Sequence, residues 1–351
     1  MKKLLYLFLI LAMLPVPASA LELTAPEVPY EARENMPGDT ENFRNGLEEL
    51  ISKGFKYLRP DLLEASRISL SLVAAVMLVS VLKTFEGPVG KSAELAGTAA
   101  AAGCLLLPSN AMIQLGARTV VEISEYGKLL LPVMTGALAA QGGITKSTAL
   151  FAGTAGFTAA LGALISRFLI PGLYLYLSLA VGGSALGENT LKKLRDLVKS
   201  LISWALKTVL TAFTSYIGLT GVISGTTDAA ALKATKATVS TVVPVVGNIL
   251  SGASETILLS AAVLKNAAGI YGILAMLAIF LEPFVKILAH YWILKLTAAL
   301  CSVLGGGPLS DLIGDFSTAM GFLLAMTGTT CLLMLIGTVC FMKGVSSDEK
   351  I

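Results

Sequence analysis

The chain has 351 residues, of which 55% are hydrophobic and only 14% are charged, whereas soluble domains carry about 25% charged residues. This shortfall, together with apolar runs long enough to form spanning helices, predicts an all-α fold, a polytopic transmembrane helical bundle. The formal net charge of +3 is small, and no basic stretch is interleaved with aromatic residues, so the composition argues against nucleic acid as a partner.

The first 20 residues, MKKLLYLFLILAMLPVPASA, are typical of a cleaved signal peptide. Lys2 and Lys3 give the charged start, residues 4–14 form a short apolar core, and residues 18–20 (Ala-Ser-Ala) form a cleavage site. An uncleaved first membrane anchor is the alternative. In both cases we expect residues 21–66 to begin outside the cytoplasm.

Residues 21–66 combine an acidic, proline-containing lead with a predicted amphipathic helix that starts near Thr40. Asp39 or Thr40 can cap this helix, and Pro60 is expected to kink or end it. Its apolar face follows helical spacing: Phe43, Leu47, Leu50, Ile51, Phe55 and Leu58. Such a helix can lie on the outer membrane surface or pack against a partner, and the sequence leaves both open.

The membrane part divides into first membrane segments (67–116), a repeat at 117–224, a second repeat at 225–342 and a polar tail at 343–351. Residues 95–115 contain Pro108 and predict a weak span or a re-entrant segment. Residues 129–140 are apolar but too short to cross the membrane alone. The other predicted spans are 68–82, 145–169, 172–186, 201–224, 257–281, 284–304 and 319–341.

The two repeats are predicted from a shared order of features. Pro132 and Pro244 are separated by the same number of residues as Pro171 and Pro283. Each half contains a broken apolar segment, a span, a proline, a second span, a glycine-rich polar turn and a last span. This order predicts an internal duplication, with chance similarity among apolar helices as the alternative.

The proline- and glycine-containing apolar segments are the predicted working part of the molecule. Backbone that is broken at membrane depth must line water or be buried in protein, and such segments form the binding sites of duplicated transporters. The alternative is a tightly packed helix kink, because glycine also allows close helix contact. The pathway-lining candidates are Pro132, Gly136, Gly142, Gly143, Pro244, Gly247, Asn248 and Gly252.

Charge bears on how the two halves are oriented. Residues 187–199 are rich in Lys and Arg, whereas the corresponding residues 305–317 contain Asp311 and Asp315 and no Lys or Arg. The positive-inside rule therefore places the first connection in the cytoplasm and allows the second outside, which would make the repeats inverted. If the short segments cross the membrane, the repeats are parallel instead, and the sequence leaves this choice open.

Two polar sets lie in apolar surroundings. Glu282, Lys286 and His290 are spaced four apart and so share one helix face, where they could form a proton relay or snorkel near a helix end at Pro283. Glu255, Lys265 and Asn266 form the second set, read either as a polar lining or as interfacial residues at a helix end. These six residues are the polar membrane candidates.

No motif predicts catalysis, a metal site or a cofactor. The four cysteines lie in apolar runs without C-x-x-C spacing, which argues against a disulfide framework or a zinc site. A single histidine excludes H-E-x-x-H, and neither G-x-S-x-G nor a phosphate-binding G-x-x-x-x-G-K-[ST] loop is present. We therefore expect no enzyme, no metal and no cofactor.

The stretch KATKATVSTVVPVVGNILSGASETILLSAAVLKNAAG, residues 233–269, resembles the core of the stage III sporulation protein AE family. Its most specific words are P-V-V-G-N (244–248) and L-K-N-A-A-G (264–269). The resemblance covers essentially the whole mature chain and is strongest from 225 to 311.

This resemblance implies a role in endospore formation. It implies a multi-pass protein in the mother-cell membrane that surrounds the forespore. It implies a secretion-like channel complex with other stage III A-operon proteins, namely an ATPase, ring-forming proteins and small membrane components. The chain would then be a membrane component of that channel, conceivably its conducting core, and could form a homo-oligomer in the lipid bilayer. The alternatives are an independent small-molecule permease and a non-conducting scaffold that docks the ATPase and the ring.

Overall fold

A computed structural model describes residues 25–84, 88–141, 143–186, 189–242, 244–305 and 307–343. The predicted signal peptide and nearly all of the polar tail lie outside these residues. The described part is helical, with no β-strand in it. Its helices are α2 (Tyr30–Arg33), α3 (Phe43–Leu82), α4 (Pro88–Ala140), α5 (Ile144–Leu164), η1 (Ile165–Leu169), α6 (Ile170–Leu186), α7 (Asn189–Val242), α8 (Pro244–Val303) and α9 (Pro308–Lys343).

Helix α3 begins two residues later than the sequence predicts. Asn42 is its N-cap and accepts a hydrogen bond from the Arg44 backbone N–H at 3.1 Å. The carboxylate of Asp39 supports the turn before it, accepting from the backbone N–H groups of Glu41 and Asn42 and from the Asn45 side chain. These donors, Asn42 first, hold the pKa of Asp39 below its usual value.

The prolines do not interrupt the helices as predicted. Helix α3 continues through Pro60, α4 through Pro108 and Pro132, and α8 through Pro283. The alternatives in which the helix ends at Pro60, residues 95–115 are re-entrant and residues 129–140 form a separate segment are therefore wrong. Neighbouring helices and local changes in helix geometry satisfy the backbone groups that a proline frees in a membrane bundle, so a helix can continue past it.

Pro171 shows one such local change. The π-helical turn η1 lies directly before it and joins α5 to α6 without a gap. A proline ring would clash with the carbonyl four residues earlier, here that of Arg167, and a π turn widens the helix at that place. The predicted spans 145–169 and 172–186 are therefore one continuous helical rod.

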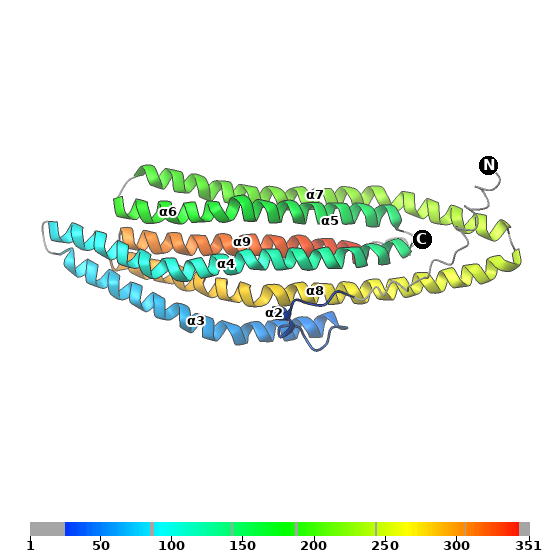
Figure 1. Cartoon of the computed structure of the whole chain (residues 1–351), viewed down its shortest axis with the longest axis horizontal. Helices are drawn as coiled ribbons and strands as arrows, with labels where there is room; N and C mark the ends of the chain where they lie inside the picture. The colour runs from blue at the N-terminus through cyan, green and yellow to red at the C-terminus, as the bar shows by residue number, and fades with distance from the viewer. Residues whose placement is uncertain are drawn as a thin grey trace, which may run out of the picture.

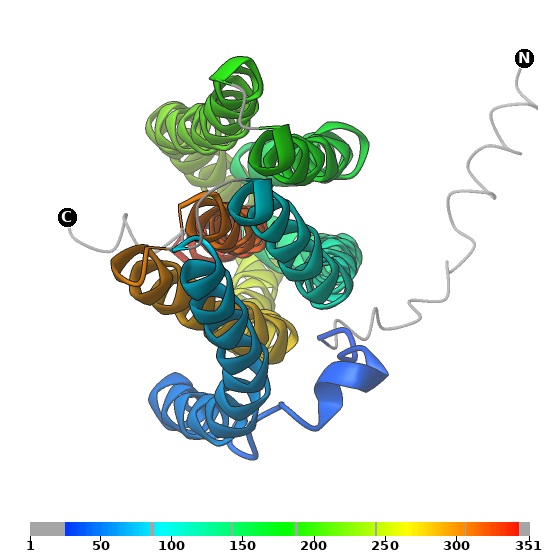
Figure 2. The ribbon, with the colours of Figure 1, turned by 90° about the vertical axis from the view of Figure 1, so that its left-hand side faces the viewer.

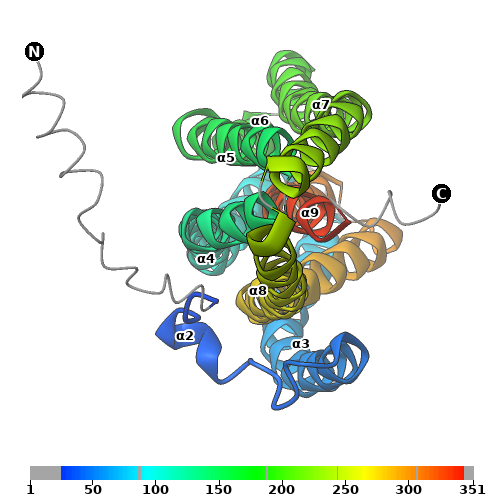
Figure 3. The same ribbon diagram turned by 90° about the vertical axis from the view of Figure 1, so that its right-hand side faces the viewer.

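Helix α9 forms the centre of a long, roughly parallel bundle (Figures 1 and 3). It contacts α4, α5, α6, α7 and α8, and α3 packs outside this group against α8 and α4. Several faces of α9 are buried at once, because Phe316, its neighbour Ser317 and Leu333 all have 0% exposure. Met320 and Leu323 are also fully buried, so apolar side chains fill most of the axis of the bundle.

The α3–α4, α6–α7 and α8–α9 connections lie at one end of the bundle, the end that faces the viewer in Figure 2. Ser80 at the end of α3 donates a hydrogen bond to the carbonyl of Leu304 at 2.9 Å, and Arg195 near the start of α7 pairs with Asp315 on α9. The basic connection and its acidic counterpart thus lie on the same side. This placement favours the parallel alternative, because the segments expected to be too short to cross are parts of longer helices.

Six helices in the described part are long and apolar enough to cross a membrane. The chain is a multi-pass helical membrane protein. Helices α4, α7 and α8 have 53, 54 and 60 residues, far more than the roughly 20 that cross the hydrocarbon core. The joined ends of α7 and α8 extend beyond the other helices (Figure 1).

Candidate functional site

A polar cavity of about 320 Å³ lies between α3, α4 and α8. Three helices direct charged or amide groups into this one space. The cavity is lined by Asp61, Glu64, Ala111, Met112, Gln114, Leu115, Arg118, Lys286 and His290.

The α8 wall of this cavity comes from the predicted polar face. Lys286 Nζ donates to Glu282 Oε1 at 2.8 Å, and the Nδ1 of His290 donates to the Lys286 carbonyl at 3.0 Å. His290 is only 6% exposed. The structure therefore places Glu282, Lys286 and His290 on one face of a continuous helix and not at a helix end.

The α3 and α4 walls were missed by the sequence reading. Asp61 is 7% exposed, and its Oδ2 has no hydrogen-bond partner among the residues that the structure describes. Glu64 lies one turn further along α3, and Gln114 and Arg118 occupy adjacent turns of α4. Their i, i+3 and i, i+4 spacing beside apolar runs is the available signal, but a predicted kink or helix end at Pro60 hides it on α3.

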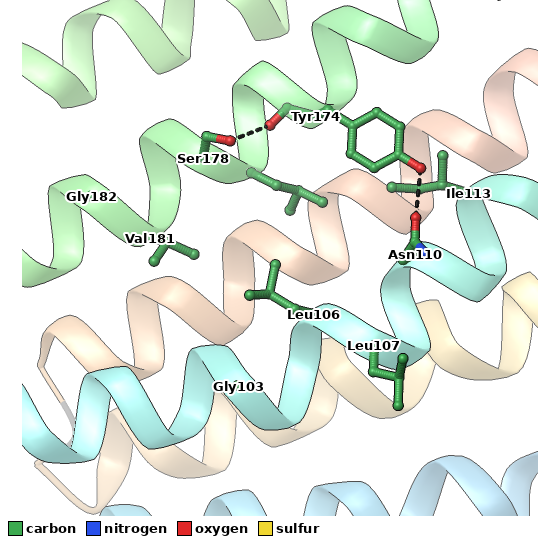
Figure 4. Close-up of a pocket in the computed structure, with 10 residues that line it drawn as sticks. Gly103, Leu106, Leu107, Asn110, Ile113, Tyr174, Ser178, Val181 and Gly182 are labelled. Carbon is green, nitrogen blue, oxygen red and sulfur yellow. Dashed lines mark hydrogen bonds between the residues drawn. The ribbon is translucent and has the colours of Figure 1, made fainter.

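A second hollow is an apolar groove of about 770 Å³ between α4 and α6 (Figure 4). Tyr174 Oη donates to Asn110 Oδ1 at 2.7 Å, and Ser178 donates to the Tyr174 carbonyl at 2.9 Å. Gly103 and Gly182 widen the groove, and Leu107 on its α4 wall is 79% exposed. The described lining residues include no Asp, Glu, His, Lys, Arg or Cys, so this groove offers packing surface and no acid–base chemistry.

A buried ion pair joins α7 to α9 near the end with the three connections. Arg195 pairs with Asp315 Oδ2, and Tyr176 of α6 donates to Asp315 Oδ1 at 2.9 Å. The Arg195 and Asp315 side chains are 14% and 13% exposed. Arg195 and Asp315, which the sequence predicts to lie in polar connections, thus lie within helices and hold α6, α7 and α9 together.

The predicted pathway residues do not form one site in the described part. Pro132 is exposed and Gly136 half-buried within α4, whereas Gly143 is buried at the N-cap of α5. Gly142 lies outside the described residues. Pro244 begins α8, and Gly247, Asn248 and Gly252 follow inside that helix. Pro132 and Gly136 thus lie inside a continuous helix, whereas Gly143 and Pro244 lie at helix starts, and a pathway at these residues stays a prediction.

The second polar set stays a prediction. Glu255, Lys265 and Asn266 all belong to α8, and the side chains of Glu255 and Lys265 lie outside the described part. Asn266 is exposed. No group of three or more His, Cys, Asp or Glu side chains that could hold a metal ion occurs in the residues searched, which are the described ones.

The model of the family described as Stage III sporulation protein AE matches residues 35–344, which include every described helix from α3 onward. The chain belongs to this family. It is also 22% identical over 313 residues to Stage III sporulation protein AE of Bacillus subtilis (strain 168), a match that covers 86% of this chain and 78% of the relative. No solved structure matches the chain. The family resemblance read from the P-V-V-G-N and L-K-N-A-A-G words is thus confirmed, and with it a role in sporulation.

Proposed function

We propose that the chain is a membrane-embedded structural subunit of a secretion-like channel complex that supplies the developing forespore, located in the mother-cell membrane around it. Its partners in this proposal are an ATPase, ring-forming proteins and small membrane proteins of the same sporulation stage. The match to the stage III sporulation protein AE family over residues 35–344 supports this proposal.

The centre of the bundle argues for a structural role in that complex. A conducting subunit needs a polar or water-filled route, whereas α9 fills the axis here with side chains such as Phe316, Ala319 and Leu323. Any conduit is then built between copies of this chain or together with the partner proteins. This favours the scaffold over the single-chain conducting core and over the independent permease.

The proposal is tested in a spore-forming host whose own copy of this gene has been replaced by a tagged one. Membranes are solubilised after engulfment, and the tagged chain is isolated under mild detergent. We expect the other proteins of the same sporulation stage to co-purify, and heat-resistant spores to be lost when the gene is deleted. Isolation of the chain without any of these proteins from cells that sporulate normally would contradict the proposal.

Reconstitution distinguishes the proposed role from that of a permease. The purified chain is placed alone in liposomes loaded with a small fluorescent dye and with salt. We expect no release of dye or ions above that of liposomes carrying heat-denatured protein. Substrate-saturable flux by the chain alone would favour the permease instead.

A further inference from the structure

The polar cavity between α3, α4 and α8 is lined by two carboxylates, Asp61 and Glu64, and by two cations, Arg118 and Lys286. Its two cations are engaged elsewhere: Lys286 pairs with Glu282 at 2.8 Å, and Arg118 lies 4.0 Å from Glu31. Asp61 and Glu64, in contrast, form no ion pair with any described residue. The α3 wall therefore presents two carboxylates to the cavity without a committed cation.

Asp61 adds an independent observation. The residue is only 7% exposed. Its Oδ2 is enclosed by protein and has no hydrogen-bond donor within the described part of the chain. Leaving a buried carboxylate oxygen without a partner is costly, because the group has lost its water. A cation that enters the cavity would remove this cost.

We propose that this cavity is a binding site for a monovalent cation, either H⁺ or Na⁺, with Asp61 as the principal ligand and Glu64 at the exposed side. A proton would bond to a carboxylate oxygen of Asp61, and a sodium ion would be coordinated by the same oxygens. The groups that face Asp61 are Glu64 on its own helix, Arg118 on α4, and Glu282, Lys286 and His290 on α8.

Other ligand classes fit the cavity less well. An anion would meet the uncommitted carboxylates of Asp61 and Glu64. No three His, Cys, Asp or Glu side chains of the described part are arranged so that they could hold a divalent metal. Glu64 is exposed to water, so one positive charge is enough for the buried carboxylate of Asp61. The cation would also join α3 to α8, because Asp61 and His290 lie on opposite walls. This inference does not depend on the proposed channel role.

The test uses the purified full chain in detergent micelles and measures its midpoint of thermal unfolding. Sodium chloride is varied against choline chloride at constant ionic strength, and pH is varied in choline chloride alone. For the unaltered chain we expect a rise of about 2 °C or more on adding sodium or on lowering the pH from neutral. Asp61→Asn keeps the shape and removes the charge, so it should lose this rise.

Glu125→Gln is the matched control, because Glu125 is an exposed carboxylate on α4 that pairs with Lys128. It should respond like the unaltered chain. A response to sodium at fixed pH identifies Na⁺, and a response to pH alone identifies H⁺. If Asp61→Asn unfolds too easily to be measured, Glu64→Gln should give a reduced rise. An Asp61→Asn or Glu64→Gln chain that responds as fully as the control overturns the proposal.

Discussion

At the scale of single residues, the pair of Arg195 and Asp315 is a largely buried ion pair between two helices of the described bundle. Both side chains are largely removed from solvent, and Tyr176 supplies a further hydrogen bond to the carboxylate. A buried pair gains little over an apolar contact, because both ions lose their hydration. Its function is to fix the relative positions of α6, α7 and α9.

Breaking this pair should be costly. Asp315→Ala leaves the Arg195 charge buried without a counter-ion and takes the acceptor from Tyr176, so we expect the free energy of unfolding to fall by about 3–5 kcal/mol. The measurement is denaturant unfolding of the purified chain in mixed micelles. Glu125→Ala, which breaks the exposed pair with Lys128, is the control and should cost about 1 kcal/mol or less. Equal effects of the two substitutions would contradict a buried role for Asp315.

Residue spacing revealed only the part of the polar cavity that lies on one helix. Glu282, Lys286 and His290 are four residues apart, and helical geometry alone brings them to one face. Asp61 is more than two hundred residues earlier in the chain and meets them only through packing of α3 on α8. Nothing local in the sequence encodes that contact, so the unpartnered carboxylate could not be predicted.

At the scale of elements, helical class and most spans follow from apolar patterning, whereas the helix ends do not. Sequence rules predict that a proline breaks a helix. In the structure Pro108, Pro132 and Pro283 lie inside helices, and a π turn precedes Pro171. In water a chain can leave the helix at a proline, because water satisfies the backbone groups that are freed there. In a bundle of long helices the neighbours impose continuity, which sequence rules drawn from soluble proteins do not capture.

The first part of α3 also packs differently from its apolar pattern. Leu50 is buried against Leu274 and Ala278 of α8, but Ile51 and Phe55 of the predicted face are 50% and 69% exposed. The helix approaches α8 through Gly46, which lies against Leu274, and Gly54, which lies against Leu281. The periodicity of large apolar side chains does not reveal such contacts. The predicted contact of the remaining face with lipid or with a partner stays a prediction.

Close contact between α8 and α4 depends on Gly272. A Cβ at this position would lie 2.6 Å from a methyl group of Leu130, whereas a Cβ at Gly156 of α5 has no atom within 4 Å. We expect Gly272→Val to lower the free energy of unfolding by about 1–3 kcal/mol through overpacking. Gly156→Val adds the same side chain without the clash and is the control. The packing account fails if both substitutions lower the unfolding midpoint equally.

At the scale of the whole molecule, three connections at one end fix the topology. Cysteine substitutions of Thr84, Lys193 and Ser302, each in a cysteine-free chain, place one exposed thiol at each connection. We expect a membrane-impermeant thiol reagent to label all three from the same side, the cytoplasmic one, because residues 187–199 are strongly basic. Labelling of Lys193→Cys and Ser302→Cys from opposite sides would instead restore the inverted arrangement.

The closed axis is the property on which the proposed structural role depends. It is tested most directly by introducing cysteines along α9 at Phe316, Leu323 and Thr330 in the cysteine-free chain and exposing sporulating cells to a water-soluble maleimide. Ser302→Cys, at an exposed connection, serves as the labelled reference once cells are permeabilised. We predict that the α9 positions stay unlabelled, since each is at most 1% exposed. Labelling of these positions as fast as the reference would mean that water runs through the centre of a single chain.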